Sequence, residues 1–282
     1  MTWVLYSVLA GMLFTAGSLL SRHILKAEKD PWAYSFWFSL GGALACFPLM
    51  LISPQVPTGW WPWALALVLG IGIVAHNVLQ FTALRYIEAS VSGSIMKLRL
   101  VWVFILGALF LGEVTTPGKM LGIVLTLAAA FLIFYKFKHK NSTKGILLVL
   151  GASVLNAGII ILIKYLLDFF NPVSLTFFGG FLFSAIFNFI LMPRSFERIT
   201  DVIKNKGKII FLSAGLGGIT NLIMYKALEV GDTTRVVVII EAFLITTLAG
   251  ESLFLREKHQ VGTKIVAVLL ATFGAILITI TV

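Results

Sequence analysis

Ten apolar runs of about membrane-spanning length follow one another along this chain of 282 residues. They cover approximately residues 3–21, 33–53, 60–83, 88–112, 117–136, 144–166, 173–193, 208–228, 233–255 and 260–281. The hydrocarbon core of a bilayer is about 30 Å thick, and about 20 helical residues cross it. Only 12% of the residues are charged, against about 25% in a soluble domain. The pattern predicts an all-α polytopic membrane protein with ten transmembrane helices.

The second half of the chain repeats the first half. A shift of 144 residues aligns residues 83–118 with residues 227–262 without a gap. The coincident positions under this shift include Asn77 with Asn221, Glu113 with Glu257 and Gly118 with Gly262. We therefore predict two five-helix repeats, residues 1–139 and 140–282. Because five is odd, the second repeat enters from the opposite side, which makes an inverted repeat.

Both repeats close on a similar motif. The first reads Leu111-Gly112-Glu113 with Gly118 after it, the second reads Leu255-Arg256-Glu257 with Gly262, and Ala-Leu pairs precede both helices. These residues resemble the EamA-type repeats of the drug/metabolite transporter superfamily. The resemblance covers the whole chain in architecture and implies a ten-helix secondary carrier with its cavity between the repeats. Leu100 and Leu244 stand where such repeats often carry a proline, so the sequence does not assure the helix break that proline would give.

The resemblance, together with the small number of residues outside the apolar runs, predicts a transporter and not an enzyme. We expect an exporter or exchanger of a small polar metabolite, anionic or zwitterionic, working by alternating access in the cell (plasma or inner) membrane. Membrane lipid is an expected partner, while coupling to a proton or counter-substrate and assembly as a homodimer stay open. The alternative is a membrane-embedded structural or partner-binding protein whose charges serve only intramembrane pairing.

No cofactor, metal ion or nucleic acid is expected. The stretch from Gly112 to Lys119 lacks the spacing of a phosphate-binding loop, and no other spacing suggests a metal site or a nucleophile triad. The formal net charge of +10 is divided among short basic clusters between apolar runs. A nucleic-acid-binding protein would instead present a continuous cationic face.

The basic residues also predict an orientation. Of the 22 lysines and arginines, sixteen fall in or beside odd-numbered connections and four beside even-numbered ones. Because positive residues are retained in the cytoplasm, this bias places the odd-numbered connections inside and both termini outside. Better-known relatives are generally drawn with both termini in the cytoplasm, so the two indications disagree.

Two cations lie in the fourth apolar run, where a basic residue costs about 2.5–3.5 kcal/mol at the helix centre. The 144-residue shift superposes Lys97 on Glu241, so these two residues are candidates for an ion pair, either structural or opening to admit substrate or a proton. Arg99 lies two residues further on, about 200° around a regular helix, so at most one of the two cations is expected to face a cavity. Arg99 either binds a carboxylate or phosphate, or hydrogen-bonds carbonyls of a neighbouring helix.

Matched amides and carboxylates complete the candidate site. Asn77 and Asn221 either hold helices together or line the cavity, and Asn156 is a weaker lining candidate. Glu113 and Glu257 each close a helix, where an anion is unfavourable, so we expect them to contact a loop or the next helix's N-terminus in a structural or gating role. His76 has no visible partner in the sequence and is interpreted as a satisfied polar residue.

Overall fold

A computed structural model describes residues 2–27, 30–83, 86–87, 92, 95–137, 142–254, 262, 266, 269–270, 272–274 and 276–277. The regular elements within these residues are all helices. They are α1 (Thr2–Ala27), α2 (Pro31–Ile52), α3 (Trp60–Ala83), α5 (Arg99–Phe110), α6 (Pro117–Phe137), α7 (Thr143–Leu166), α8 (Pro172–Leu175), the π-helix η2 (Thr176–Leu182), α9 (Phe183–Leu191), α10 (Ser195–Val230) and α11 (Thr233–Phe254).

Five helical segments are long and apolar enough to cross a membrane. They are Pro31–Ile52, Trp60–Ala83, Thr143–Leu166, Pro172–Leu191 and Gly207–Val230. Shorter apolar helices cover Thr2–Gly17, Arg99–Phe110 and Pro117–Ala129. The chain is therefore a multi-pass helical membrane protein, as the sequence predicts.

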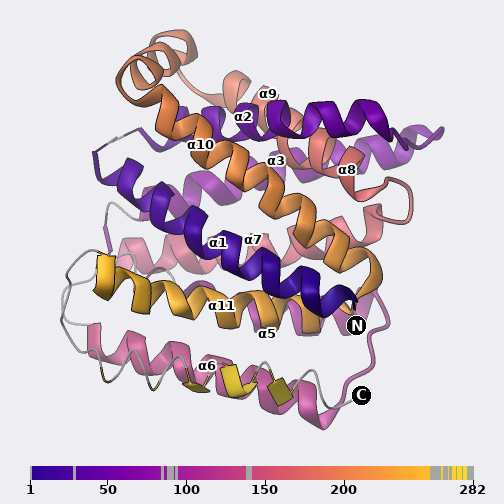
Figure 1. The fold of residues 1–282 in the computed structure, drawn as a ribbon, viewed down its shortest axis with the longest axis vertical. Coiled ribbons are helices and arrows are strands. Elements are labelled where there is room, and N and C mark those ends of the chain that lie inside the picture. Colours follow the sequence, from indigo (N-terminus) through magenta and orange to yellow (C-terminus); the bar gives the residue numbers. More distant parts are fainter. Residues whose placement is uncertain are drawn as a thin grey trace.

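The long helices lie side by side in two layers (Figure 1). In the nearer layer α1 packs between α10 and α11, and in the farther layer α7 packs between α3 and α5. Helices from the first half of the chain thus contact helices from the second half in both layers. The largest cluster of buried apolar side chains lies between these layers and includes Leu100 and Val103 of α5, Ile160 and Ile163 of α7, and Val236 to Ile240 of α11.

Two helix starts that lie 141 residues apart in the sequence use the same cap. Asp30 precedes Pro31 and accepts hydrogen bonds from the backbone N–H groups of the next residues, and Asn171 precedes Pro172 and accepts one from Ser174 N at 2.7 Å. A side-chain oxygen at this position satisfies amide groups that have no partner inside the helix. Proline suits the first helical position because its missing N–H would be unpaired there in any case.

Asp30 also binds Arg198 of α10 through both carboxylate oxygens. Burial works to raise the pKa of Asp30, but hydrogen bonds from Arg198 and from the Ala33 and Trp32 amides lower it below 3.8, its ordinary value. A depressed pKa contributes stability that is present above pH 3.8 and is lost as the pH falls through the folded-state pKa. Asp30 lies just outside the membrane-spanning segment of α2.

We expect Asp30→Asn to lower the free energy of unfolding by about 1 kcal/mol at pH 7, because asparagine keeps the cap but loses the ion pair. Thermal unfolding of the purified protein in detergent should show this difference narrowing as the pH falls below 3.8. Asp201→Asn, which changes an exposed acid on α10, is the matched control. A difference between Asp30→Asn and the wild type that is independent of pH would contradict the ion-pair account.

One expected helix is interrupted, and the interruption positions the site. Leu98 N donates to Ile95 O at 3.0 Å, Leu100 N to Lys97 O at 3.0 Å and Val101 N to Leu98 O at 3.1 Å. These bonds span three residues instead of four, so the chain makes a tighter turn at Lys97 and Leu98 and α5 begins only at Arg99. The break occurs although Leu100 replaces the family's proline. In contrast, α11 continues without a break through Leu244.

Helix α10 also differs from the expected run of 208–228. It begins at Ser195 and continues for 36 residues, so the charged stretch expected as a connection is helical. Its first turns dock on α2, where Trp37 Nε1 donates to Ile199 O at 2.8 Å. Hydropathy detects the apolar segment of such a helix that lies in the membrane, and it misses the charged segment that extends beyond the membrane.

Candidate functional site

Three charged side chains meet between α5 and α11, and we call Lys97, Arg99 and Glu241 the charge cluster. Lys97 Nζ contacts one carboxylate oxygen of Glu241 and donates to its backbone O at 3.0 Å, while Arg99 Nη2 contacts the other carboxylate oxygen. The exposed fraction is 2% for the Glu241 side chain, 7% for Lys97 and 16% for Arg99. Two cations therefore share one carboxylate, which leaves the charge cluster with one net positive charge.

The expectation that Lys97 and Arg99 point to opposite sides is wrong, because both reach the same carboxylate. That expectation assumed a regular helix through both residues. Lys97 lies instead in the turn before α5, and Arg99 is the first residue of the helix. The turn interrupts the regular rotation of 100° per residue, which would have placed the two side chains on opposite sides of a helix.

The charge cluster continues into a chain of hydrogen bonds through α7 and α3. Arg99 Nη1 donates to Asn156 Oδ1 at 2.6 Å, and Asn156 Nδ2 lies 3.3 Å from His76 Nε2. His76 Nδ1 in turn lies 3.1 Å from Ala152 O. The Arg99 Nε atom is buried and has no hydrogen-bond partner among the residues that the structure describes. Four helices, two from each half of the chain, thus supply one connected set of polar groups.

The other predicted asparagines do not join the charge cluster. Asn77 Nδ2 donates to Ser35 Oγ at 3.3 Å, and the same hydroxyl accepts from Asn188 Nδ2 at 3.2 Å. This second polar group lies between α2, α3 and α9. Asn221 Nδ2 donates to Gly217 O of its own helix at 2.9 Å. The repeat-related amides therefore have different partners in the two halves.

The sequence did not predict that His76 belongs to this set of polar groups. The sequence shows no partner for this residue, whereas the partner Asn156 is 80 positions away and not related to it by the repeat. The one available signal was that both are polar residues within strongly apolar runs. Among the described residues, no group of three or more His, Cys, Asp or Glu side chains is placed to hold a metal ion.

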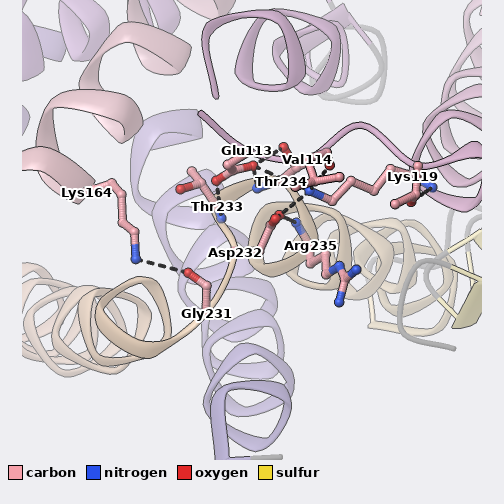
Figure 2. Close-up of polar contacts among 10 residues, drawn as sticks. Glu113, Val114, Lys119, Lys164, Gly231, Asp232, Thr233, Thr234 and Arg235 are labelled. Carbon is pink, nitrogen blue, oxygen red and sulfur yellow. Dashed lines mark hydrogen bonds and ion pairs between the residues drawn. The ribbon is translucent and has the colours of Figure 1, made fainter. Parts of the chain in front are cut away.

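Another cluster of polar contacts, separate from the charge cluster and from the Ser35 group, surrounds the start of α11 (Figure 2). Glu113 accepts from Thr233 N at 2.6 Å, and from Thr234 N at 3.3 Å and Thr234 Oγ1 at 2.8 Å. Asp232 Oδ1 accepts from Arg235 N at 3.1 Å. Two carboxylates thus bind the amide groups at the positive end of the helix dipole, which is favourable for anions.

Lys119 of α6 links the carboxylates of this cluster. Its Nζ contacts Asp232 Oδ2, donates to Val114 O at 2.7 Å and lies 3.9 Å from Glu113 Oε2, and its side chain is 2% exposed. We call Glu113, Lys119, Asp232, Thr233 and Thr234 the end cluster. Since Thr233 and Glu241 are eight residues apart on α11, the end cluster lies about 12 Å along the helix from the charge cluster.

Glu113 accepts hydrogen bonds from the N-terminus of α11, in the other half of the chain, and also lies 3.9 Å from Lys119 Nζ in the first turn of the next helix, α6. The contact with α11 spans both halves, which a gate between them requires. Glu257, its predicted counterpart, lies outside the described residues. The gating roles of both residues stay predictions.

We expect Lys119→Met to lower the free energy of unfolding by about 2–3 kcal/mol, because Asp232 and Glu113 would face each other without their cation. The matched control is Lys164→Met. Lys164 Nζ donates to Leu228 O at 2.5 Å and Gly231 O at 3.1 Å at the end of α10, so its loss costs about 1 kcal/mol. Thermal unfolding in detergent measures both. An equal or larger loss for Lys164→Met would contradict the importance of the end cluster.

Comparison with known proteins places the chain in a family. The model of the EamA-like transporter family matches residues 1–135 and 143–280. The chain belongs to this family. This membership confirms the all-helical, ten-helix repeat fold and identifies a membrane transporter, not an enzyme. The alternative of a purely structural or partner-binding membrane protein is therefore not retained.

Two relatives of this EamA-like transporter are informative. It is 26% identical over 196 residues to an uncharacterized transporter of Archaeoglobus fulgidus, covering 69% of this chain and 70% of that relative. A solved crystal structure of a protein matches it with a TM-score of 0.76, covering 99% of this chain and 96% of that one. The sequence identity with that structure is 17%, so this match shows the fold alone.

Proposed function

We propose that this EamA-like transporter exports or exchanges a small polar metabolite that carries a carboxylate or phosphate group, and that the charge cluster is its substrate site. The observation that carries the proposal is the charge balance of that cluster. Lys97 and the largely buried Arg99 share a single carboxylate, Glu241, so among the residues that the structure describes one positive charge of the cluster is not neutralised. An anionic group of a substrate would neutralise this charge.

Arg99 is the group best placed to take the anion. Lys97 has two oxygen partners on Glu241, whereas Arg99 is the more exposed cation and its Nε is unpaired. A guanidinium binds a carboxylate or phosphate through two parallel hydrogen bonds. A zwitterion would add an amino group, for which Glu241 is the acceptor. Asn77 and Asn221 are left out of the proposed site because their amides bind Ser35 and Gly217.

The position of both clusters supports alternating access. The charge cluster and the end cluster each combine residues from the two halves of the chain, so movement of one half against the other would change both. We propose that the end cluster closes one face of the transporter by holding the start of α11 to the segment between α5 and α6. Opening of this face would require Glu113 to release the α11 amides.

A screen on the purified full-length protein tests the substrate class. Thermal unfolding is followed with matched sets of anionic, zwitterionic, neutral and cationic metabolites of similar size. We expect stabilising compounds to share a carboxylate or phosphate group, and the effect to be lost in Arg99→Gln. Stabilisation by cationic compounds that persists in Arg99→Gln would contradict the proposed site.

A further inference from the structure

One backbone carbonyl sets the direction of every hydrogen bond between His76 and Arg99. Ala152 O can only accept, so His76 Nδ1, at 3.1 Å, must carry the proton. In the neutral ring Nε2 is then an acceptor, and Asn156 presents its Nδ2 to it at 3.3 Å. The amide oxygen of Asn156 consequently faces the other way and accepts from Arg99 Nη1 at 2.6 Å. His76 therefore orients Asn156, and Asn156 holds Arg99.

We propose that His76 is a proton-operated positioning residue that controls the availability of Arg99 and so couples proton uptake to anion binding. The proposal deepens the proposed function and rests on it for the anion. It assigns a role to a buried ring that the proposed substrate site does not use. The neutral ring corresponds to the state seen here, with Arg99 held by Asn156.

Protonation reverses the hydrogen-bonding role of one ring nitrogen. A proton from water adds to the Nε2 lone pair, after which both ring nitrogens donate. Asn156 can then pair with Nε2 only by turning its amide, so that Oδ1 accepts from the ring. Its NH2 group then faces Arg99 Nη1, and two donors cannot bond. Arg99 loses that partner, which leaves Nη1 available for an anion on the edge of the guanidinium away from Nε.

The surrounding charges link the proton to the anion. Among the described residues, Arg99 of α5 is the charged group that acts on the His76 ring. Lys97 and Glu241 lie on the far side of Arg99. The helices α2, η2 and α9, which also pack on α3, carry only Tyr34 and Cys46 as titratable groups. On α3 itself the Gln80 side chain also hydrogen-bonds the His76 ring.

The titratable residues of α7 are distant from the ring. They are Lys144, Lys164 and Tyr165, each at least eight residues, or about 12 Å, from both Ala152 and Asn156. A protonated His76 therefore adds its charge mainly to that of Arg99, which is unfavourable until an anion neutralises the pair. Proton and anion must then favour each other's binding by the same factor.

Two substitutions separate the parts of this account. His76→Gln keeps a donor for Ala152 O and an acceptor for Asn156 but cannot take up a proton near neutral pH. His76→Leu removes both and frees the Asn156 amide. We expect the affinity of the glutamine variant for anions to be independent of pH over the whole range in which the wild-type affinity changes. A positioning role without proton uptake would instead leave wild type and His76→Gln with the same pH profile.

Nitrogen NMR of the full-length protein, labelled at its four histidines, provides a readout that needs no known substrate. The His76 signals are identified by their absence in His76→Gln. We expect the Nδ1–H tautomer at alkaline pH, and a rise of at least about tenfold in proton affinity in Arg99→Gln, where the neighbouring charge is removed. Adding glutamate or inorganic phosphate should raise the proton affinity of His76 in the wild type and not in Arg99→Gln.

The outcomes distinguish the two proposals. An Nε2–H tautomer, or a titration that is the same with and without Arg99, would overturn the His76 switch. A titration that depends on Arg99 but does not respond to glutamate or phosphate would instead contradict the proposed anion site.

Discussion

Glu241→Gln is expected to destabilise the protein by about 3–5 kcal/mol, because it leaves the buried Lys97 and the largely buried Arg99 without their shared carboxylate. For a chain of this size that corresponds to a fall of at least about 5 °C in the midpoint of thermal unfolding. Glu229→Gln, which changes an exposed glutamate at the end of α10, is the matched control and should have little effect. An unchanged midpoint for Glu241→Gln would contradict the charge balance described for the cluster.

The double substitution Lys97→Met with Glu241→Gln sharpens this prediction. It removes one cation together with the anion, and the remaining cation, Arg99, keeps its bond to Asn156 Oδ1. We expect part of the lost stability to return, since only one unpaired charge stays buried. If the loss of stability in the double variant equals the sum of the losses in the two single variants, the two residues are not coupled as the structure indicates.

Arg99→Gln is expected to weaken binding of the anionic compounds found by the screen by at least about 30-fold, because a charge-assisted hydrogen bond contributes about 2–3 kcal/mol. The fold should persist, since Lys97 and Glu241 remain as a neutral pair. Arg99→Lys keeps the charge but cannot bind both an anion and Asn156 through a planar fork, so we expect an intermediate loss. Equilibrium binding to the purified variants measures both effects.

The matched control for Arg99 is Lys208→Gln, which removes an exposed cation from α10. It changes the net charge of the protein equally but lies outside the charge cluster. Binding that falls as much in Lys208→Gln as in Arg99→Gln would show a general electrostatic effect in place of a specific site.

Much of the fold is predictable from the sequence because its signals are local. Apolar length identifies the membrane segments, and Asp30-Pro31 and Asn171-Pro172 mark helix starts that the structure contains. The turn at Lys97 was not predictable, because neither proline nor glycine marks it. The charged beginning of α10 was missed because hydropathy reports burial in lipid and not helix formation.

The candidate site was only partly accessible to sequence reasoning. The 144-residue shift places Lys97 opposite Glu241, and the structure joins these two side chains because they project toward each other from the two halves. Arg99 has no repeat-related partner, yet it reaches the same carboxylate from the first turn of α5. The bond between His76 and Asn156 depends on how α3 packs against α7, which no repeat or spacing encodes.

The central claim is that an excess positive charge at the charge cluster binds the anion, and one comparison tests it most directly. Binding of the anionic compound that stabilises the wild type most is measured in Lys97→Met and in the double variant Lys97→Met with Glu241→Gln. The single variant has no net charge in the cluster and should bind weakly, whereas the double variant restores one positive charge on Arg99 and should recover binding. Binding that stays weak in the double variant, although the protein is folded, would contradict the account.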